Sequence, residues 1–298
     1  MINIKIICKR SLLISIMALI NESSNTNYQP VFCTLFNISN EHLTKDLGLI
    51  PYGMHIFEGY DSFIATYING DYPNLKYTTG LRIEEVPKLS GDWIKDSCAW
   101  LRKNANRIDV LNLYHVRNRS LKHILAYKLS NPKGKVYLKM DGCTYPRSMW
   151  RFWRNIKPKL ILKLCKCVST EFQENAEKLS HSWKNRIIWV SNPSNPKEIQ
   201  DFRPFSERSN TILTVGRQGT KQKATEILLE AFARISGKIP DWKLKLAGYI
   251  AENMNIASDF YAKYPELKER VAFTGEIRDR NILVEAYRDA KIFAFPSR

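Results

Sequence analysis

The sequence predicts an α/β protein made of two doubly wound, Rossmann-like domains that face a cleft. From residue 31 onward, short apolar runs alternate with helix-like stretches, and after a polar segment the same alternation begins again. Strands that alternate with helices form parallel sheets with helices packed on their faces. The chain has 298 residues, of which 44% are hydrophobic, and this is enough apolar material for the cores of two such domains.

The first series predicts an N-terminal domain over residues 31–192, preceded by a leading extension at 1–30. A long helix is predicted over 92–107, where the apolar side chains recur with helical spacing. Another helix is predicted after the sixth strand, with Ser169 or Thr170 as its N-cap. The predicted strands are Val31–Leu35, Ser62–Tyr67, Leu81–Val86, Asp109–His115, Lys135–Met140, Leu164–Ser169 and Arg186–Val190.

The second series predicts a C-terminal domain over residues 210–298, joined to the first by a linker at 193–209. The linker follows from composition, because a Ser-Asn-Pro-Ser-Asn-Pro run begins at Ser191 and mixed polar residues follow it. We expect this domain to be incomplete, because a full dinucleotide-type sheet has about six strands. The predicted strands are Thr211–Val215, Trp242–Ala247, Arg270–Phe273 and Lys291–Phe295, and the predicted helices are Ala224–Ser236, Ile256–Tyr264 and Asn281–Arg288.

The positive charge of the chain is concentrated in its N-terminal part. The net charge is +17, and residues 1–200 carry 29 Lys and Arg against 16 Asp and Glu. A basic half of this kind predicts an anionic neighbour, such as nucleic acid, an anionic membrane surface or a phosphorylated substrate. The sequence contains no helix-turn-helix, zinc or RNP-type motif, which argues against a nucleic-acid-binding protein.

The cysteines and the N-terminus bear on the location of the protein. No CxxC pair is present among the six cysteines, so we expect no metal site and a reducing, cytoplasmic compartment. Cys165 and Cys167 alternate within an apolar run, which predicts packing within a strand.

Basic residues precede an apolar run at 12–20, as in a signal peptide, but no small-x-small cleavage site follows and the run is too short to span a bilayer. A leading segment is the alternative interpretation.

A candidate anion site lies between the first strand and the first helix of the second series. Gly216 follows the strand and lets backbone approach a ligand closely, and Arg217 and Lys223 add two cations before the helix begins. The N-terminus of a helix favours anions through its free N–H groups and its dipole, and an Arg fork and a Lys point charge suit a diphosphate. An ordinary turn with solvated basic residues is the other interpretation. Neither a Walker pattern nor a GxGxxG fingerprint is present.

Residues 211–298 resemble the C-terminal domain of glycosyltransferase family 4, whose members have the two-domain GT-B fold. In that family, residues that match Arg217 and Lys223 bind the donor diphosphate, and Gly usually stands where this chain has Ala224. The matching segments are Thr214-Val-Gly-Arg217, the Lys six residues after that Arg, Glu226-Ile-Leu-Leu-Glu-Ala-Phe232, Asp241-Trp-Lys-Leu-Lys-Leu-Ala-Gly248, Val271-Ala-Phe-Thr-Gly275 and Ala290-Lys-Ile-Phe-Ala-Phe-Pro-Ser297.

The resemblance implies a retaining transferase that moves a sugar from a nucleotide-sugar to a glycan or lipid-linked acceptor. It implies no cofactor and no bound metal, and the sequence has no Asp-x-Asp motif for a divalent ion. The family's Glu-x7-Glu donor signature is expected within a few residues of Arg298, where the chain ends. We therefore expect a chain truncated before this motif, and an inactive remnant of such an enzyme is the alternative to an active one.

The acceptor side of the predicted cleft contains three candidate residues. Asp141 follows a strand, where it would position or deprotonate an acceptor hydroxyl, or else is an ordinary Asp at a strand-to-loop junction. His115 ends another strand and would contact substrate, or else is a partly buried structural histidine. Gly48 would open the first βα loop near the acceptor, or else is a turn or helix glycine. Asn192 is interpreted as a hinge residue.

A basic and aromatic tract runs from Tyr145 to Lys166. Interleaved Trp, Phe, Arg and Lys residues suit an anionic membrane interface, and an amphipathic helix that packs its Trp residues inward is the alternative. Contact with the inner face of the membrane would suit a lipid-linked acceptor. A nicotinamide-dependent oxidoreductase fits the α/β pattern but lacks the Gly-rich fingerprint.

Overall fold

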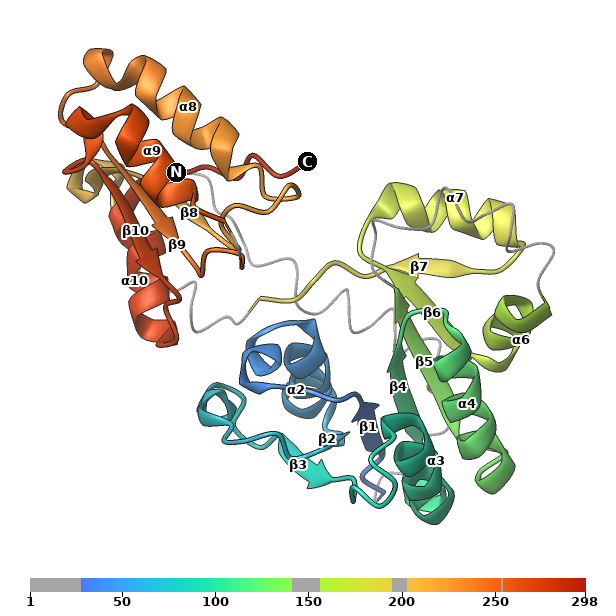
Figure 1. The fold of residues 1–298 in the computed structure, drawn as a ribbon. Coiled ribbons are helices and arrows are strands. Elements are labelled where there is room, and N and C mark those ends of the chain that lie inside the picture. Colours follow the sequence, from blue (N-terminus) through green and yellow to red (C-terminus); the bar gives the residue numbers. More distant parts are fainter. Residues whose placement is uncertain (1–27, 141–155, 195–202, 253) are drawn as a thin grey trace. The chain divides into compact units, whose positions relative to one another are not determined.

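A computed structural model describes residues 28–140, 156–194, 203–252 and 254–298. The chain divides into two compact units between Asn195 and Pro196, and each unit is described by itself. Both units are α/β structures with a parallel sheet, in agreement with the predicted fold class (Figure 1).

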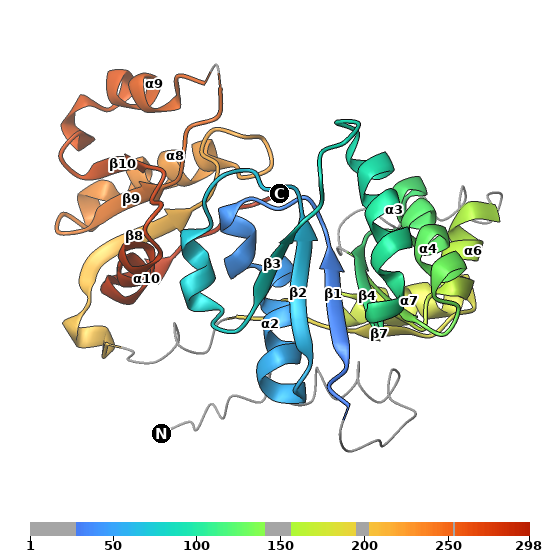
Figure 2. The same cartoon turned by 90° about the horizontal axis from the view of Figure 1, so that it is seen from below.

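The first unit is built on a seven-stranded sheet in the order β3-β2-β1-β4-β5-β6-β7, and every neighbouring pair is parallel. The first strand lies inside the sheet, and the chain adds strands on one side of it before crossing to the other (Figure 2). The carboxyl ends of all strands therefore lie at one edge, where ligands of such sheets bind. The strands are β1 Val31–Leu35, β2 Asp61–Thr66, β3 Arg82–Glu85, β4 Val110–Tyr114, β5 Lys135–Met140, β6 Cys167–Thr170 and β7 Ile187–Trp189.

Helices pack on both faces of this sheet. Successive strand residues point to opposite faces, and Phe32 packs in the cluster that contains Ile50 and Met54, whereas Cys33 packs in the cluster that contains Leu101 and Ile124. One face is therefore covered by α2 and the other by α3, α4, α6 and α7, with α3 and α4 side by side (Figure 1). The bounds are α2 Asp46–Glu58, α3 Trp93–Asn104, α4 Asn118–Ser130, α6 Ile156–Leu164 and α7 Gln173–Trp183.

Three sequence predictions in this unit were wrong in detail. The predicted strand at 164–169 begins three residues too early, because α6 continues to Leu164 and β6 begins only at Cys167. Cys165 therefore lies between the two elements and does not share a strand with Cys167. Helix α7 begins at Gln173 with Phe172 at its N-cap, since Ser169 and Thr170 are the paired last residues of β6.

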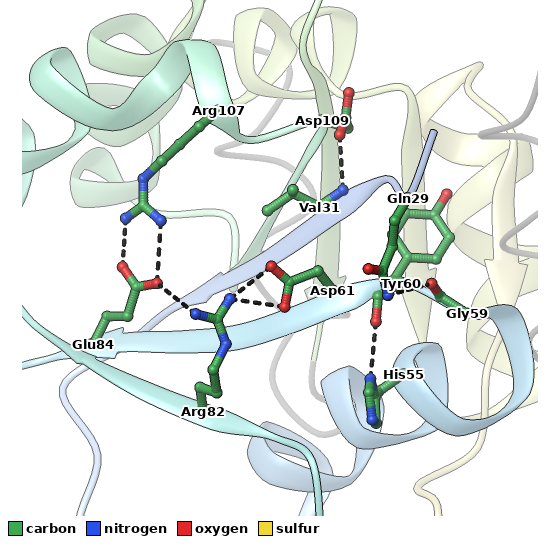
Figure 3. Close-up of polar contacts among 10 residues, drawn as sticks. All are labelled: Gln29, Val31, His55, Gly59, Tyr60, Asp61, Arg82, Glu84, Arg107 and Asp109. Atoms are coloured by element: carbon green, nitrogen blue, oxygen red, sulfur yellow. Dashed lines mark hydrogen bonds and ion pairs between the residues drawn. The ribbon is translucent and has the colours of Figure 1, made fainter. Parts of the chain in front are cut away.

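A chain of ion pairs links β2, the edge strand β3 and Arg107 (Figure 3). The Asp61 carboxylate accepts two hydrogen bonds from Nη2 of Arg82, at 2.7 and 2.6 Å, and Glu84 pairs with both Arg82 and Arg107. Both guanidinium groups also lie over the Phe63 ring, 5.7 and 4.9 Å from its centroid. Charged side chains on an edge strand discourage pairing with another chain.

The second unit has a four-stranded parallel sheet in the order β10-β9-β8-β11 within the described residues. Ile212 packs with Leu229 of α8 and Phe260 of α9, and the next residue, Leu213, packs with Ala286 of α10, so the helices lie on opposite faces (Figure 1). The bounds are β8 Ser209–Val215, α8 Thr225–Ile235, β9 Lys243–Ala247, α9 Ile256–Lys263, β10 Val271–Gly275, α10 Arg280–Asp289 and β11 Ala290–Phe293.

Candidate functional site

The candidate anion site is the loop from Gly216 to Ala224, which joins the carboxyl end of β8 to the start of α8. A buried glutamine holds this loop in place. The Gln218 side chain donates from Nε2 to the carbonyl oxygens of Gly216 and Ala247, each at 2.9 Å, and accepts a hydrogen bond from Thr225 at 3.1 Å. The Thr225 hydroxyl in turn accepts from the Gly219 N–H at 3.1 Å. Buried polar networks with every member bonded make a segment rigid.

Sequence reasoning missed Gln218 and Thr225. Neither residue carries charge, and a Gln in a polar loop usually points to solvent. Only its burial distinguishes Gln218 from an ordinary loop glutamine, since the residue is 2% exposed. A sequence signal does exist in hindsight, since Thr225 begins a strongly amphipathic helix directly after a basic loop and offers a hydroxyl for local bonds.

Two glycines bring the backbones of this loop and of the β9 end together. A Cβ at Gly248 would lie 2.0 Å from the carbonyl oxygen of Gly216. Gly248 also has a φ of 121°, a backbone angle that residues other than Gly rarely adopt. The Gly216 N–H also donates to the carbonyl of Ala247 at 2.9 Å. The start of the loop therefore packs directly against the carboxyl end of β9.

Gly248→Ala is expected to destabilise the second unit by about 1–3 kcal/mol, because its φ is strained for Ala and its Cβ would displace the Gly216 carbonyl. Urea unfolding followed by far-UV circular dichroism measures the change. Gly237→Ala is the matched control, since nothing lies within 4 Å of a Cβ built there. Equal effects of the two substitutions would contradict the close approach.

Arg217 and Lys223 lie at the two ends of the loop. Arg217 is exposed, and its guanidinium donates to Gln222 at 3.3 Å. The Lys223 stem runs beside Gly216, and its ammonium lies 4.3 Å from the centroid of the Phe295 ring. Within the part of the chain that the structure describes, neither side chain pairs with a carboxylate, so both cations are available to an anion.

Ala224 occupies the N-cap of α8 in the left-handed conformation, with a φ of 51°. This conformation is strained for Ala and free of strain for Gly. The left-handed conformation accounts for the Gly that usually stands at this position in glycosyltransferase family 4, which the sequence resembles. The buried methyl group of Ala224 offsets part of the strain.

The second unit, and most of the chain as a whole, resemble known glycosyltransferases. Residues 209–298 match the protein family "Glycosyl transferases group 1". The match covers β8, the loop with Arg217 and Lys223, and all described elements that follow them. A curated protein of Haemophilus influenzae, named an uncharacterized glycosyltransferase, is 24% identical over 257 residues, which are 81% of this chain and 66% of the relative. The chain thus spans slightly less than two thirds of the length of this relative.

Solved structures show the fold. A glycosyltransferase from Rickettsia africae superimposes with a TM-score of 0.66 at 15% identity, over 90% of this chain and 73% of that one. An Anabaena protein solved in complex with UDP superimposes with a TM-score of 0.56 at 12% identity, over 90% of this chain and 74% of that one. UDP-N-acetylglucosamine 2-epimerases are also among the similar structures. The fold is of the GT-B type that both groups share.

The acceptor-side candidates fall in different places in the first unit. His115 directly follows β4 with a φ of 65°, and its N–H donates to the carbonyl of Lys139 at 2.8 Å. Asp141 lies outside the described residues. Gly48 does not open the first βα loop but lies in the first turn of α2, where a Cβ would lie 2.2 Å from the carbonyl oxygen of Leu43. Close packing therefore explains this glycine.

A buried lysine, Lys139, marks the same edge of the sheet. Its side chain is fully buried, and its ammonium donates to Asn192 at 2.6 Å and lies 3.3 Å from carboxylate oxygens of both Asp46 and Glu171. Asn192 also donates to Glu171 at 2.9 Å. We refer to Asp46, Lys139, Glu171 and Asn192 as the lysine cluster. It ties the start of α2 to the ends of β5 and β6 and to the segment after β7.

The basic and aromatic tract is described only from Ile156 onward. In α6, Ile161 and Leu162 are buried, whereas Lys157, Lys159 and Lys163 are exposed, as in an amphipathic helix that packs its apolar side inward. No described helix is long and apolar enough to cross a membrane. Among the described residues, no group of three or more His, Cys, Asp or Glu side chains is placed to hold a metal ion.

Proposed function

We propose that the protein is a retaining glycosyltransferase that transfers a sugar from a nucleotide-sugar to a glycan or lipid-linked acceptor. The observation that carries the proposal is the match of residues 209–298 to the group 1 family, because this match includes a rigid loop whose two cations pair with no carboxylate among the described residues. The Anabaena neighbour solved with UDP and the Rickettsia glycosyltransferase share the fold.

The proposed chemistry follows from the charge of the loop. Transfer breaks the bond between the anomeric carbon and the diphosphate oxygen, and a bond forms from that carbon to the acceptor oxygen. The proton of the acceptor hydroxyl passes to the departing diphosphate. The leaving diphosphate gains negative charge in this step, and fixed positive groups that face it lower the barrier. Arg217, Lys223 and the free N–H groups at the start of α8 are such groups. With this much positive charge, the proposal needs no divalent metal.

Arg217→Ala and Lys223→Ala are each expected to weaken UDP binding by about 1.5–3 kcal/mol, which is about 10- to 150-fold in Kd, the range for a charge-assisted hydrogen bond. Isothermal titration calorimetry with UDP measures the change. Lys221→Ala is the matched control, because Lys221 is an exposed cation of the same loop to which the family resemblance gives no diphosphate contact. A loss for Lys221→Ala as large as for Lys223→Ala would show a diffuse basic surface instead of a site.

A second function is raised by the epimerases among the similar structures. Incubation with UDP-N-acetylglucosamine separates the two activities. A transferase releases UDP and forms a glycoside only when an acceptor is present, whereas an epimerase inverts a carbon of the sugar without needing an acceptor. Formation of the epimer without an acceptor would contradict the proposed function.

A further inference from the structure

The first unit contains a pocket of its own. It has a volume of about 280 Å³ and is formed at the carboxyl ends of β1 and β4 and the first turns of α3 and α4. All of its lining residues belong to the described chain. The carboxyl edge of a parallel sheet is the usual place for a ligand, yet none of the residues singled out from the sequence lines this pocket.

Aromatic rings form the apolar part of the pocket. Phe36, Trp93 and Tyr114 line it, and the Phe36 and Tyr114 rings meet edge to face with centroids 5.7 Å apart. The Trp93 ring makes a similar edge-to-face contact with Tyr67, with centroids 4.9 Å apart. Rings fixed by such contacts keep their geometry without a ligand. Flat apolar faces of this size suit the C–H face of a sugar ring.

The charge of the pocket comes from Arg119. Its guanidinium lies 6.0 Å from the centroid of the Phe36 ring, and among the described residues no carboxylate pairs with it. Burial, together with the like charge of Arg117, lowers the pKa of Arg119. A partly buried cation without a counterion is unfavourable, and an anion bound in the pocket would relieve this.

The other polar residues of the pocket do not compete for an anion's place. His123 is buried and bonded to the Ser97 hydroxyl at 2.8 Å, and burial lowers its pKa to about 4, so it is neutral near pH 7. The Ser120 hydroxyl donates to the His115 carbonyl at 2.6 Å. The exposed Asn37 at the rim accepts a hydrogen bond from Asn69 on its amide oxygen at 2.6 Å, and its amide NH2 group can donate to a ligand hydroxyl.

We propose that this pocket binds an anionic sugar, with a phosphate or carboxylate group on Arg119 and the sugar ring against Phe36, Trp93 and Tyr114. This inference rests on the proposed function in one respect, since it makes the anionic sugar the acceptor. The excess positive charge of residues 1–200 favours the approach of such an acceptor.

The test is direct binding to the whole chain at fixed ionic strength, with glucose 1-phosphate, glucuronic acid, glucose and inorganic phosphate as probes. Calorimetry is combined with the fluorescence change of Trp93, judged against a Trp93→Phe variant. We expect the sugar phosphate or the uronic acid to bind at least tenfold more tightly than glucose and than phosphate alone. The tighter of the two identifies the anionic group. Equal binding of glucose, or of phosphate alone, would overturn the proposal.

Arg119→Gln is expected to weaken binding of the anionic sugar at least tenfold. Lys122→Gln is the matched control, since Lys122 is an exposed cation of the same helix that does not line the pocket. Equal losses for both variants would show a general charge effect and overturn the assignment. UDP binding measured on the same samples should not change with Arg119→Gln. Failure of UDP binding with the sugar site intact would contradict the proposed function alone, and the reverse result would contradict the pocket alone.

Discussion

Lys139→Met is expected to destabilise the first unit by about 3–5 kcal/mol, the cost of removing one partner from a buried ion pair. The ammonium is fully buried, and without it the carboxylates of Asp46 and Glu171 would face each other with side chains only 18% exposed. Asn192 would also lose a 2.6 Å hydrogen bond. Urea unfolding followed by tryptophan fluorescence measures the effect, since every tryptophan except Trp242 lies in the first 195 residues.

Two further variants show whether charge or packing causes the loss. Lys133→Met removes an exposed cation just before β5 and should change stability by less than about 0.5 kcal/mol. The triple variant with Lys139→Met, Asp46→Asn and Glu171→Gln removes the unpaired charges as well. It should recover most of the lost stability, because replacing a whole buried ion pair is often nearly neutral. A triple variant as unstable as Lys139→Met alone would contradict the electrostatic explanation.

Acidification from pH 7 to pH 5 is expected to cost the first unit about 2 kcal/mol through His123 alone. Burial, followed by the charges of Arg119 and Lys122, lowers the pKa of His123 from 6.5 to about 4. Between these two values the unfolded chain binds a proton that the folded chain does not. The contribution of His123 is thus complete above pH 6.5 and is lost as the pH falls toward 4, where the cost approaches about 3 kcal/mol.

The measurement is the free energy of unfolding of wild type and His123→Gln at pH 7, 6 and 5. The wild-type protein should lose about 2 kcal/mol more than the variant across this range. His181→Gln, which replaces an exposed histidine, should follow the wild-type curve. Parallel curves for wild type and His123→Gln would show that His123 takes up its proton in the folded protein without cost.

Much of the fold could be predicted from the alternation of apolar runs. The strands at Val31–Leu35 and Lys135–Met140 have the bounds that the sequence predicts, because each is a continuous buried run between turn residues. The helix α2 was not foreseen. It contains Gly48, Pro51 and Gly53, which weaken any helical signal, and eight consecutive buried residues remove its amphipathic pattern.

The candidate site was predictable only where charge marked it. Arg217 and Lys223 stand out in sequence as cations beside a glycine, whereas Gln218 and Thr225 act through burial and hydrogen bonds that depend on the fold. The role of Lys139 could not be predicted from the sequence for a similar reason. A lysine near the end of an apolar strand looks like a residue that reaches solvent, and its partners lie 32 and 53 residues away at Glu171 and Asn192.

The strand order of the first unit has a consequence for synthesis on the ribosome. The strand β1 pairs with both β2 and β4, so the earliest described strand serves as the template for both halves of the sheet. From β4 onward, each new strand joins the outer edge left by the one before it, in the order in which it is made. The nascent chain can therefore extend this sheet strand by strand, and no strand has to be inserted between two that are already paired.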